Sequence, residues 1–241
     1  MEEKAYKLLA LQEGITNRSA KDLIDKGLVY AQGRKVVMAR ALMDARTKFR
    51  VEKIQKIEKI FEDEHLIAVN KPAFLTSEQI SKKFKTPLLH RLDKETSGVL
   101  LLVKDEKFQK EAIEAFKNHE VLKEYEAWVS GRVAEAFEID KPILTIKRGK
   151  NLFSRVSKNG KEAVSYIEPL EIDGKFSKVK VTIKTGRTHQ IRVHLADSGH
   201  AIVGDATYGG KNAKRVMLHA KKIELLGYGF EAPTPKDFKV F

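Results

Sequence analysis

The sequence predicts an α+β protein, in which a mixed or antiparallel sheet packs against helices and a small αα-hairpin module precedes it. Three observations support this fold class. Strand-like segments recur without the regular strand–helix alternation that builds parallel sheets. The run GVLLLVK, residues 98–104, is apolar up to its last residue, as expected for a central strand buried on both faces. Residues 107–119, KFQKEAIEAFKNH, have the spacing of an amphipathic helix.

The N-terminal segment predicts two short helices. Apolar spacing indicates the first over residues 4–12, ended by Gly14. For the second, Ser19 has the character of an N-cap and Asp22 stands in the capping-box position. Gly27 is placed as the residue that follows the end of this helix.

A hairpin and a linker complete the first module. Residues 28–37, LVYAQGRKVV, contain a Gln-Gly turn between two apolar runs, which predicts a small β-hairpin. In residues 51–60, VEKIQKIEKI, charge alternates with isoleucine, as in a linker. We place the boundary near residue 55, which divides the chain into domains 1–55 and 56–241.

The larger domain contains further strands and one ambiguous segment. Residues 188–199, THQIRVHLADSG, fit a strand or a helix. We prefer a helix, because Thr188 can serve as N-cap and Gly199 can follow its last turn. Strands are predicted within HLIAVNKP, YEAWVSG, EAVSYIEPL and KVKVTIKTG.

Composition narrows the class of partner. A net charge of +13 and a pI near 9.6 predict attraction to a polyanion, most often nucleic acid. An anionic membrane surface is the alternative, but the charge spreads along the whole chain and no basic amphipathic anchor stands out. The absence of cysteine excludes disulfides and cysteine-ligated metal sites. With no signal peptide or membrane-length apolar run, we expect a cytoplasmic protein.

Asp93 is the main candidate for chemistry. It stands between Arg91 and Lys94, whose charges would keep a half-buried carboxylate ionised. Thr96 and the Ser-Gly pair after it can form a tight turn that fixes the backbone. An ionised and positioned carboxylate can act as nucleophile or base. On composition alone, a structural Asp–Arg pair is the better explanation of the pattern.

The motif around Asp93 resembles the central motif of the RluA-type RNA pseudouridine synthases, and it does not stand alone. HRLDKETSG is accompanied, in the order found in that family, by segments that cover nearly all of residues 61–235. His90 and the Ser-Gly pair favour the RluA branch over the related RsuA branch. The matching segments are FEDEHLIAVNKPA, LKEYEAWVSG, TGRTHQIRVHLADSGHAIVGDATYGG and MLHAKKIEL.

The resemblance implies isomerisation of uridine to pseudouridine within RNA, with Asp93 as the catalytic aspartate. Tyr125 matches the tyrosine that stacks on the flipped uracil and helps with the proton at C5. Arg91 matches the arginine that replaces the flipped nucleotide, and Leu218 the apolar residue lining the uracil pocket. No cofactor or metal is implied, since substrate and product are isomers. Whether the aspartate attacks C1′ or removes a ribose proton stays open.

Asp93 also needs a fixed cationic partner. Arg187 lies in the Gly-Arg-Thr turn, where we expect it to meet RNA. Arg192 would lie one turn into the predicted helix, on a rigid element that suits a bidentate ion pair. We therefore predict Arg192 as the partner.

The segment ITNRSAKDLIDKGLVYAQGRKVV resembles the S4 RNA-binding domain. This resemblance implies that Arg18, Lys21 and Lys26 contact RNA phosphates, and it favours ribosomal over transfer RNA. Solvated charges on a helical hairpin are the alternative. We expect a monomer, because no apolar stripe beyond the core stands out.

Two departures from the family pattern concern substrate choice. Phe74 stands where the family usually has glycine, and the stretch from Pro72 to His90 is short. Two other functions are alternatives to pseudouridine synthesis. One is a non-catalytic RNA-binding assembly factor. The other is a nucleoside glycosidase, which would need a second acid such as Glu95.

Overall fold

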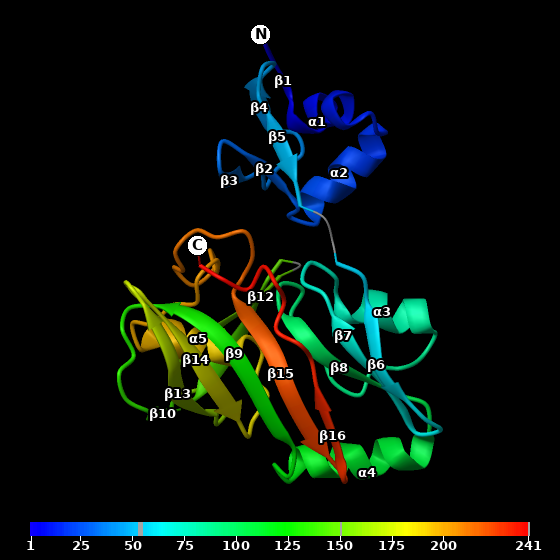
Figure 1. Cartoon of the computed structure of the whole chain (residues 1–241), viewed down its shortest axis with the longest axis vertical. Helices are drawn as coiled ribbons and strands as arrows, with labels where there is room; N and C mark the ends of the chain where they lie inside the picture. Colours follow the sequence, from blue (N-terminus) through cyan, green and yellow to red (C-terminus); the bar gives the residue numbers. More distant parts are fainter. Residues whose placement is uncertain (53–54, 150, 241) are drawn as a thin grey trace. The chain divides into compact units, whose positions relative to one another are not determined.

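The structure, a computed structural model, describes residues 1–52, 55–149 and 151–240. It separates into two compact units, Met1–Lys56 and Ile57–Phe241 (Figure 1). Each unit has its own buried apolar cluster, and each is described by itself. No helix within these ranges is long and apolar enough to cross a membrane.

The N-terminal unit packs two helices against short strands, around a core that includes Leu9, Ile24 and Phe49. One sheet has the order β3-β2-β5 and the other pairs β1 with β4. The elements are β1 (Glu2–Lys4), α1 (Ala5–Glu13), α2 (Asn17–Asp25), β2 (Val29–Ala31), β3 (Arg34–Lys35), β4 (Leu42–Asp44) and β5 (Phe49–Val51).

The predicted start of the second helix is wrong. Thr16, not Ser19, is the N-cap of α2, and its hydroxyl accepts a hydrogen bond from the Ser19 N–H at 3.1 Å. Thr16 is extended, whereas Ser19 already lies inside the helix. The end of α2 and the hairpin turn are confirmed: Gly27 has φ 73°, and Gln32 and Gly33 both have positive φ between β2 and β3.

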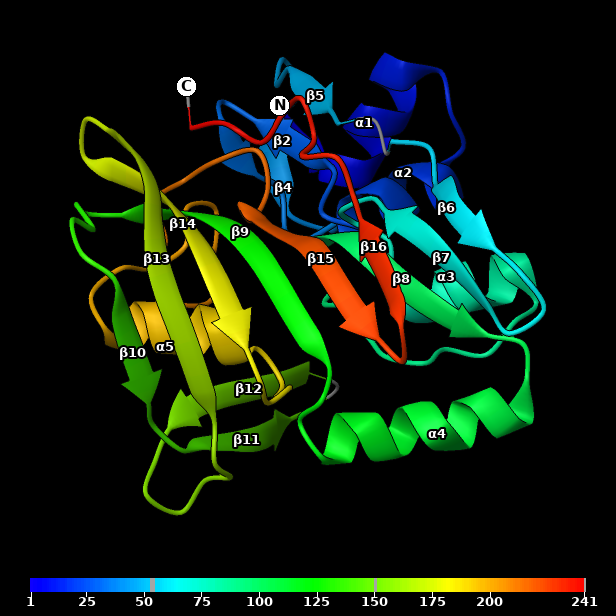
Figure 2. The same ribbon diagram turned by 60° about the horizontal axis from the view of Figure 1, so that its bottom comes forward.

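The C-terminal unit is built on one large mixed sheet, as predicted (Figures 1 and 2). Its order is β10-β13-β14-β9-β15-β8-β7-β6, and β16 pairs with β15. Among the described strands of this sheet, β8 and β15 run parallel and the other pairs are antiparallel. The strands are β6 (Glu58–Glu62), β7 (Leu66–Lys71), β8 (Ser97–Val103), β9 (Leu122–Ser130), β10 (Phe137–Asp140), β13 (Val164–Asp173), β14 (Phe176–Ile183), β15 (Leu218–Leu225) and β16 (Tyr228–Glu231).

The prediction of a central, doubly buried strand is confirmed for β8. Successive side chains of a strand point to opposite faces. On one face, Leu100 and Leu102 pack in a cluster with Ile80 of α3. On the other, Leu101 packs in a cluster with Phe108 of α4. The three helices of this unit are α3 (Ser77–Phe84), α4 (Glu106–Lys117) and α5 (Gln190–Asp197).

Helix α5 forms where we preferred a helix to a strand, but its first turn differs from the prediction. His189, with φ 56°, occupies the N-cap position, and Thr188 does not cap. The amide of Gln190 organises this turn instead, since its Oε1 accepts the Arg187 N–H at 3.0 Å. Gly199, with φ 84°, follows the last turn as predicted.

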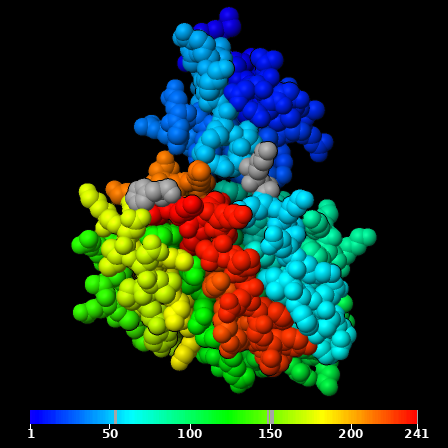
Figure 3. Space-filling view, viewed as in Figure 1, coloured from blue at the N-terminus to red at the C-terminus, as the bar shows by residue number. Residues whose placement is uncertain are grey.

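Two segments complete the unit. Strands β11 (Ile143–Arg148) and β12 (Asn151–Val156) form a separate hairpin (Figure 2). The chain after β15, red in Figure 3, runs across the visible face of the unit. Phe238 in this segment is buried, and its carbonyl accepts the Trp128 indole N–H at 3.2 Å.

Candidate active site

Asp93 lies in the loop between α3 and β8, and hydrogen bonds hold this loop on both sides of it. Before Asp93, the Leu92 N–H donates to the Ser77 hydroxyl, which donates to the Leu92 carbonyl, both at 3.0 Å. After it, the Thr96 N–H donates to the Asp93 carbonyl at 3.2 Å. The backbone that carries the carboxylate is therefore fixed by the buried end of a helix and the start of a strand.

The glycine that follows the Asp93 loop is required by strand packing. Gly98 pairs with Ala220 where β8 runs parallel to β15. A Cβ on Gly98 would lie 2.1 Å from the Ala220 carbonyl oxygen, and the residue has φ 116°. Glycine alone accommodates both constraints without displacing β15. The Ser-Gly pair thus brings the Asp93 loop against the strand that supplies Leu218.

Arg192 is the cation that meets Asp93. Its Nη1 donates to Asp93 Oδ2 at 3.0 Å, across 99 residues of sequence. Arg91, which the sequence placed beside this carboxylate, instead forms an ion pair with Glu78 at 2.9 Å, and its side chain is largely exposed. The local Asp–Arg pair, which was the alternative explanation of the motif, is therefore not formed by Arg91 among the described residues, and the predicted long-range partner on α5 contacts Asp93 instead.

Asp205 fixes Arg192. Its carboxylate accepts hydrogen bonds from Arg192 Nε at 2.6 Å and from Nη2 at 2.9 Å. The bidentate pair that we expected with Asp93 is thus made with Asp205, and Asp93 receives one donor. Burial alone would lower the pKa of the Arg192 guanidinium, but hydrogen bonds to Asp205 and the charges of Asp205 and Asp93 raise it. The cation is permanent and pre-oriented toward Asp93.

His189 makes a second contact with Asp93, and Tyr208 orients the His189 ring. The sequence did not predict either contact. His189 Nε2 lies 3.8 Å from Asp93 Oδ2, and its Nδ1 lies 2.8 Å from the Tyr208 hydroxyl. That hydroxyl already accepts the Ser154 N–H at 3.0 Å, so its own hydrogen can go to Nδ1. Burial lowers the pKa of His189, which favours a neutral ring with its hydrogen on Nε2, facing Asp93.

A small cavity of about 100 Å³ opens beside Asp93. It brings together the residues that the resemblance singled out. Tyr125, Leu218, Arg91, Arg187 and Arg192 all line it. Its volume is small compared with that of the wider cavity beside it. A wider cavity of about 830 Å³ also contains Asp93 and extends to the β11–β12 hairpin.

Tyr125 stays protonated in this setting. Burial raises the pKa of its phenol, and the nearby Asp93 charge raises it further. A neutral phenol offers an aromatic face and a hydrogen-bond donor. It is a poor base at neutral pH, so the stacking role has more physical support than proton removal by the phenol itself.

The remaining predicted residues have other neighbours. The Arg187 Nε donates to the Glu162 carbonyl at 2.8 Å while the residue lines both cavities. The three basic residues of the N-terminal unit lie on or beside α2. Arg18 is exposed, Lys21 lies 4.3 Å above the Tyr6 ring, and Lys26 pairs with Asp22 at 2.5 Å.

A buried lysine, Lys71, contacts the loop that carries Asp93. The sequence did not predict this contact. Lys71 is fully buried, and its ammonium donates to the carbonyls of Pro72, Leu75 and Lys94 at 2.7–3.3 Å. Burial lowers the pKa of Lys71 to about 7. In the sequence, Lys71 is distinguished only by its position before Pro72, and this position does not indicate that the lysine is buried.

Phe74 occupies a glycine-like conformation next to the same loop. It has φ 71°, in the left-handed region, and its side chain is buried. Its N–H donates to the Lys94 carbonyl at 2.8 Å. This left-handed conformation is one that glycine adopts without the steric cost that a side chain carries.

Within the described residues, no group of three or more His, Asp or Glu side chains is arranged to hold a metal ion. His189 faces Asp93, as described above. His194 is buried, with its two ring nitrogens near the Ser165 hydroxyl and the Lys141 carbonyl.

Comparison with known proteins identifies the family. The sequence model described as RNA pseudouridylate synthase matches residues 65–197. The chain belongs to the RNA pseudouridine synthase family. An uncharacterized RNA pseudouridine synthase of Helicobacter pylori is 53% identical over 99% of this chain and all of its own length. Pseudouridine formation in RNA is therefore the activity of this synthase.

Other relatives differ in the RNA that their names give. A ribosomal large subunit pseudouridine synthase D of Vibrio cholerae is 31% identical, over 79% of this chain and 64% of its own. A tRNA pseudouridine synthase C of the same species is 33% identical, over 70% and 85%. Among solved structures, human RNA pseudouridylate synthase domain containing 1 has a TM-score of 0.66 and 27% identity, covering 76% of the synthase and 85% of its own chain.

Proposed function

We propose that the synthase isomerises specific uridines of structured ribosomal RNA, with Asp93 as the catalytic carboxylate. One observation carries this assignment. Asp93 is the carboxylate at which the small cavity, the pre-oriented Arg192 and the neutral His189 converge. A fixed carboxylate next to a slot for one ring is the arrangement that chemistry at the C1′ of a flipped uridine requires.

The reaction exchanges one bond for another. The bond between C1′ and uracil N1 breaks, the base turns within the slot, and C5 bonds to C1′. The hydrogen on C5 leaves to solvent and N1 gains a proton, so atoms and charge balance without a cofactor. Tyr125 stacks on the base, and Leu218 lines the pocket that holds it. Arg91 enters the RNA helix in place of the flipped nucleotide. The permanent Arg192 cation holds the Asp93 carboxylate in position through its hydrogen bond at 3.0 Å.

The choice of ribosomal RNA rests on the N-terminal domain, residues 1–55. Its two helices followed by a β2–β3 hairpin agree with an S4-like RNA-binding module. Arg18, Lys21 and Lys26 would contact phosphates there. The central motif favours the RluA branch for the C-terminal domain, residues 56–241. Relatives named for ribosomal and for transfer RNA both exist, so the two RNAs must be tested separately.

Tritium release tests the proposal. RNA labelled with tritium at uridine C5 must lose it to water when C5 bonds to C1′. We expect release from ribosomal RNA by the wild type and none by Asp93→Asn, which removes the charge with little change of shape. Glu95→Gln, which removes a neighbouring carboxylate that lines only the wider cavity, should keep most of the activity. Release by Asp93→Asn would overturn the role of Asp93, and release from transfer RNA alone would overturn the substrate.

A further inference from the structure

A third cavity, of about 590 Å³, lies at another part of the C-terminal unit, and none of its lining residues lines the cavities at Asp93. It is formed where β9 ends and where the β13–β14 hairpin turns. We call it the hairpin-end site, and its lining residues are Ser130, Gly131, Arg132, Gly174, Lys175, Phe176 and Lys211. We propose that the hairpin-end site binds the phosphate backbone of the substrate RNA, an inference that rests on the proposed function.

The charge of the hairpin-end site is positive and unbalanced. Arg132, Lys175 and Lys211 are exposed, and no carboxylate is found among the described residues that line the cavity. Among the described residues, none of these three cations forms an ion pair. Lys178 and Lys180, farther along β14, are instead paired with Glu126 and Glu168. The cations at the hairpin end are thus available to neutralise phosphates, as RNA binding requires.

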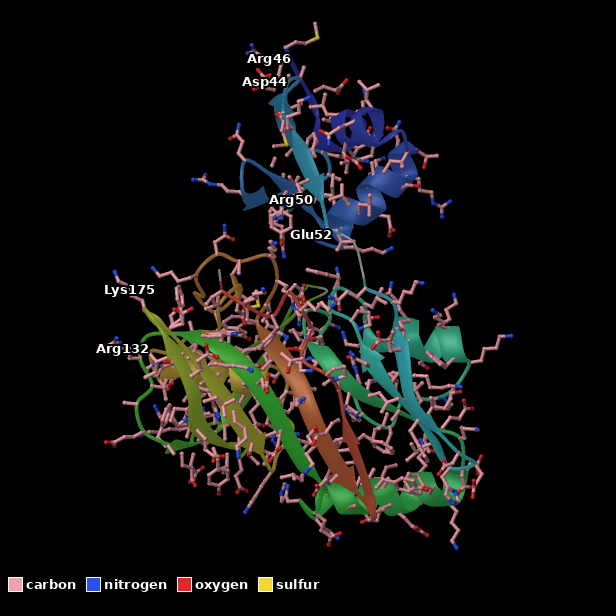
Figure 4. All side chains as sticks on the ribbon, in the orientation of Figure 1. Asp44, Arg46, Arg50, Glu52, Arg132 and Lys175 are labelled. Carbon is pink, nitrogen blue, oxygen red and sulfur yellow. The ribbon has the colours of Figure 1, made fainter. Side chains whose placement is uncertain are left out.

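The side chains of Arg132 and Lys175 project from the same side of the unit, beyond the end of β9 and at the β13–β14 turn (Figure 4). Their positions are set by the backbone. The Gly131 N–H donates to the Lys175 carbonyl at 2.8 Å, which ties the end of β9 to the hairpin turn. Arg132 Nε donates to the Gly174 carbonyl at 3.3 Å, which leaves its two terminal nitrogens for a ligand. Two hydrogen bonds therefore hold the segments that carry Arg132 and Lys175 together.

The floor of the site suits an anion. Gly131 and Gly174 have positive φ and no side chains, so a phosphate can approach the backbone closely. The Ser130 hydroxyl oxygen is buried and has no hydrogen-bond partner among the described residues. A buried hydroxyl without a hydrogen-bond partner costs free energy. The Ser130 hydroxyl would recover this free energy by donating a hydrogen bond to a phosphate oxygen. Phe176, half-buried at the rim, adds the aromatic component common at single-stranded nucleic-acid sites.

Salt-dependent binding provides the test. The variant is Arg132→Gln/Lys175→Gln/Lys211→Gln, and the probes are a fluorescein-labelled single-stranded RNA of mixed sequence and a large-subunit ribosomal RNA transcript. Each lost phosphate contact lowers the slope of log K against log[KCl] by about 0.7 for single strands. We expect the slope of the triple variant to fall by about 2, and binding at low salt to weaken correspondingly. An unchanged slope would overturn the proposal.

A matched control separates the site from net charge. Lys83→Gln/Lys107→Gln/Lys110→Gln removes the same three charges from exposed positions on α3 and α4. It should lower the slope by much less than the hairpin-end variant. Equal losses in both variants would show that only total charge matters and would overturn the site. Protection of Lys175 and Lys211 from acetylation by bound RNA, read by mass spectrometry, tests the same contact in the unmodified protein.

Measurements of tritium release distinguish failure of the hairpin-end site from failure of the proposed function. At saturating RNA, the hairpin-end variant should keep the wild-type kcat for tritium release and raise KM, because its residues lie away from Asp93. Loss of kcat at saturation would contradict a role restricted to binding. If the wild type releases no tritium but the variant still lowers the salt slope, the RNA site stands and the proposed reaction fails.

Discussion

Arg192 and Asp205 form a buried bidentate ion pair that aims the third guanidinium nitrogen at Asp93. Asp205 has no exposed surface, and the Arg192 side chain is 5% exposed. Arg192 comes from α5, and Asp205 from the loop 13 residues later. Because both prongs of the fork are engaged, the direction of Nη1 is set before substrate arrives. The active site therefore depends on a residue that does not touch the small cavity.

Substituting Asp205 should damage catalysis without altering Asp93. Asp205→Asn removes the charge that orients Arg192, and a hydrogen bond to a charged group is worth about 1.5–3 kcal/mol, which corresponds to about 10- to 100-fold in rate. We expect a loss of that size in kcat for tritium release, with KM little changed. Asp197→Asn, at a carboxylate on α5 that pairs with Lys141 at 2.7 Å, should behave as wild type. A folded Asp205→Asn enzyme with normal kcat would contradict the orienting role.

Replacing Arg192 should also affect stability. Arg192→Met leaves the Asp205 carboxylate buried without its cation, and removing one partner of a buried pair costs about 3–5 kcal/mol. Urea unfolding would measure this loss. The double variant Arg192→Met/Asp205→Leu should recover part of the free energy of unfolding while remaining inactive. Equal stability of the single and double variants would refute the buried-pair account.

Removing the Tyr208 hydroxyl tests the His189 tautomer. In Tyr208→Phe, the Nδ1 of His189 loses its partner at 2.8 Å, so the ring hydrogen is no longer directed to Nε2 beside Asp93. We expect kcat to fall by about 10-fold, the cost of one hydrogen bond of about 1 kcal/mol or slightly more. Tyr228→Phe removes a hydroxyl that contacts Asp63 instead, and it should leave kcat unchanged. A normal kcat in Tyr208→Phe would rule out this arrangement.

The buried Lys71 should make stability depend on pH. Its folded pKa is about 7, below the ordinary value of 10.5, so between these values the unfolded chain binds the additional proton. The free energy of unfolding should then rise with pH across this window, by at most about 1.4 kcal/mol per pH unit from this group. Lys71→Met should lose that slope, which urea unfolding at pH 7, 8.5 and 10 would detect. Parallel pH profiles of the two proteins would contradict the shifted pKa.

Phe74 offers a test of backbone strain. Both Phe74→Ala and Phe74→Gly lose the buried ring, but only alanine retains the strain of φ 71°. We expect the glycine variant to be more stable by about 1 kcal/mol. At Phe230, a buried residue of β16, the order should reverse, because glycine weakens an ordinary strand. An alanine variant as stable as the glycine variant at position 74 would show that the strain is absent.

Local patterns in the sequence were sufficient for only part of the elements, and α3, the β11–β12 hairpin and β15 were not predicted. The apolar run of β8, the spacing of α4 and the glycines after α2 and α5 act over a few residues, so they can be recognised without the fold. The two wrong caps, Ser19 and Thr188, share one cause. Several neighbouring polar residues could cap each helix, and the choice depends on where the preceding chain turns.

The residues of the candidate site likewise fall into those that the sequence predicted and those that only the structure brought together. The sequence by itself marked Asp93 and proposed Arg192 as its partner, because both lie in motifs with a recognisable order of residues. Only the tertiary structure showed that Asp205 rather than Asp93 takes the bidentate pair, that His189 faces Asp93, and that Lys71 is buried beneath the loop. The residues in these contacts are brought together by α5 and by the strand order β9-β15-β8-β7. Coulomb and hydrogen-bond energies depend on distances between atoms, and the order of residues along the chain does not specify those distances.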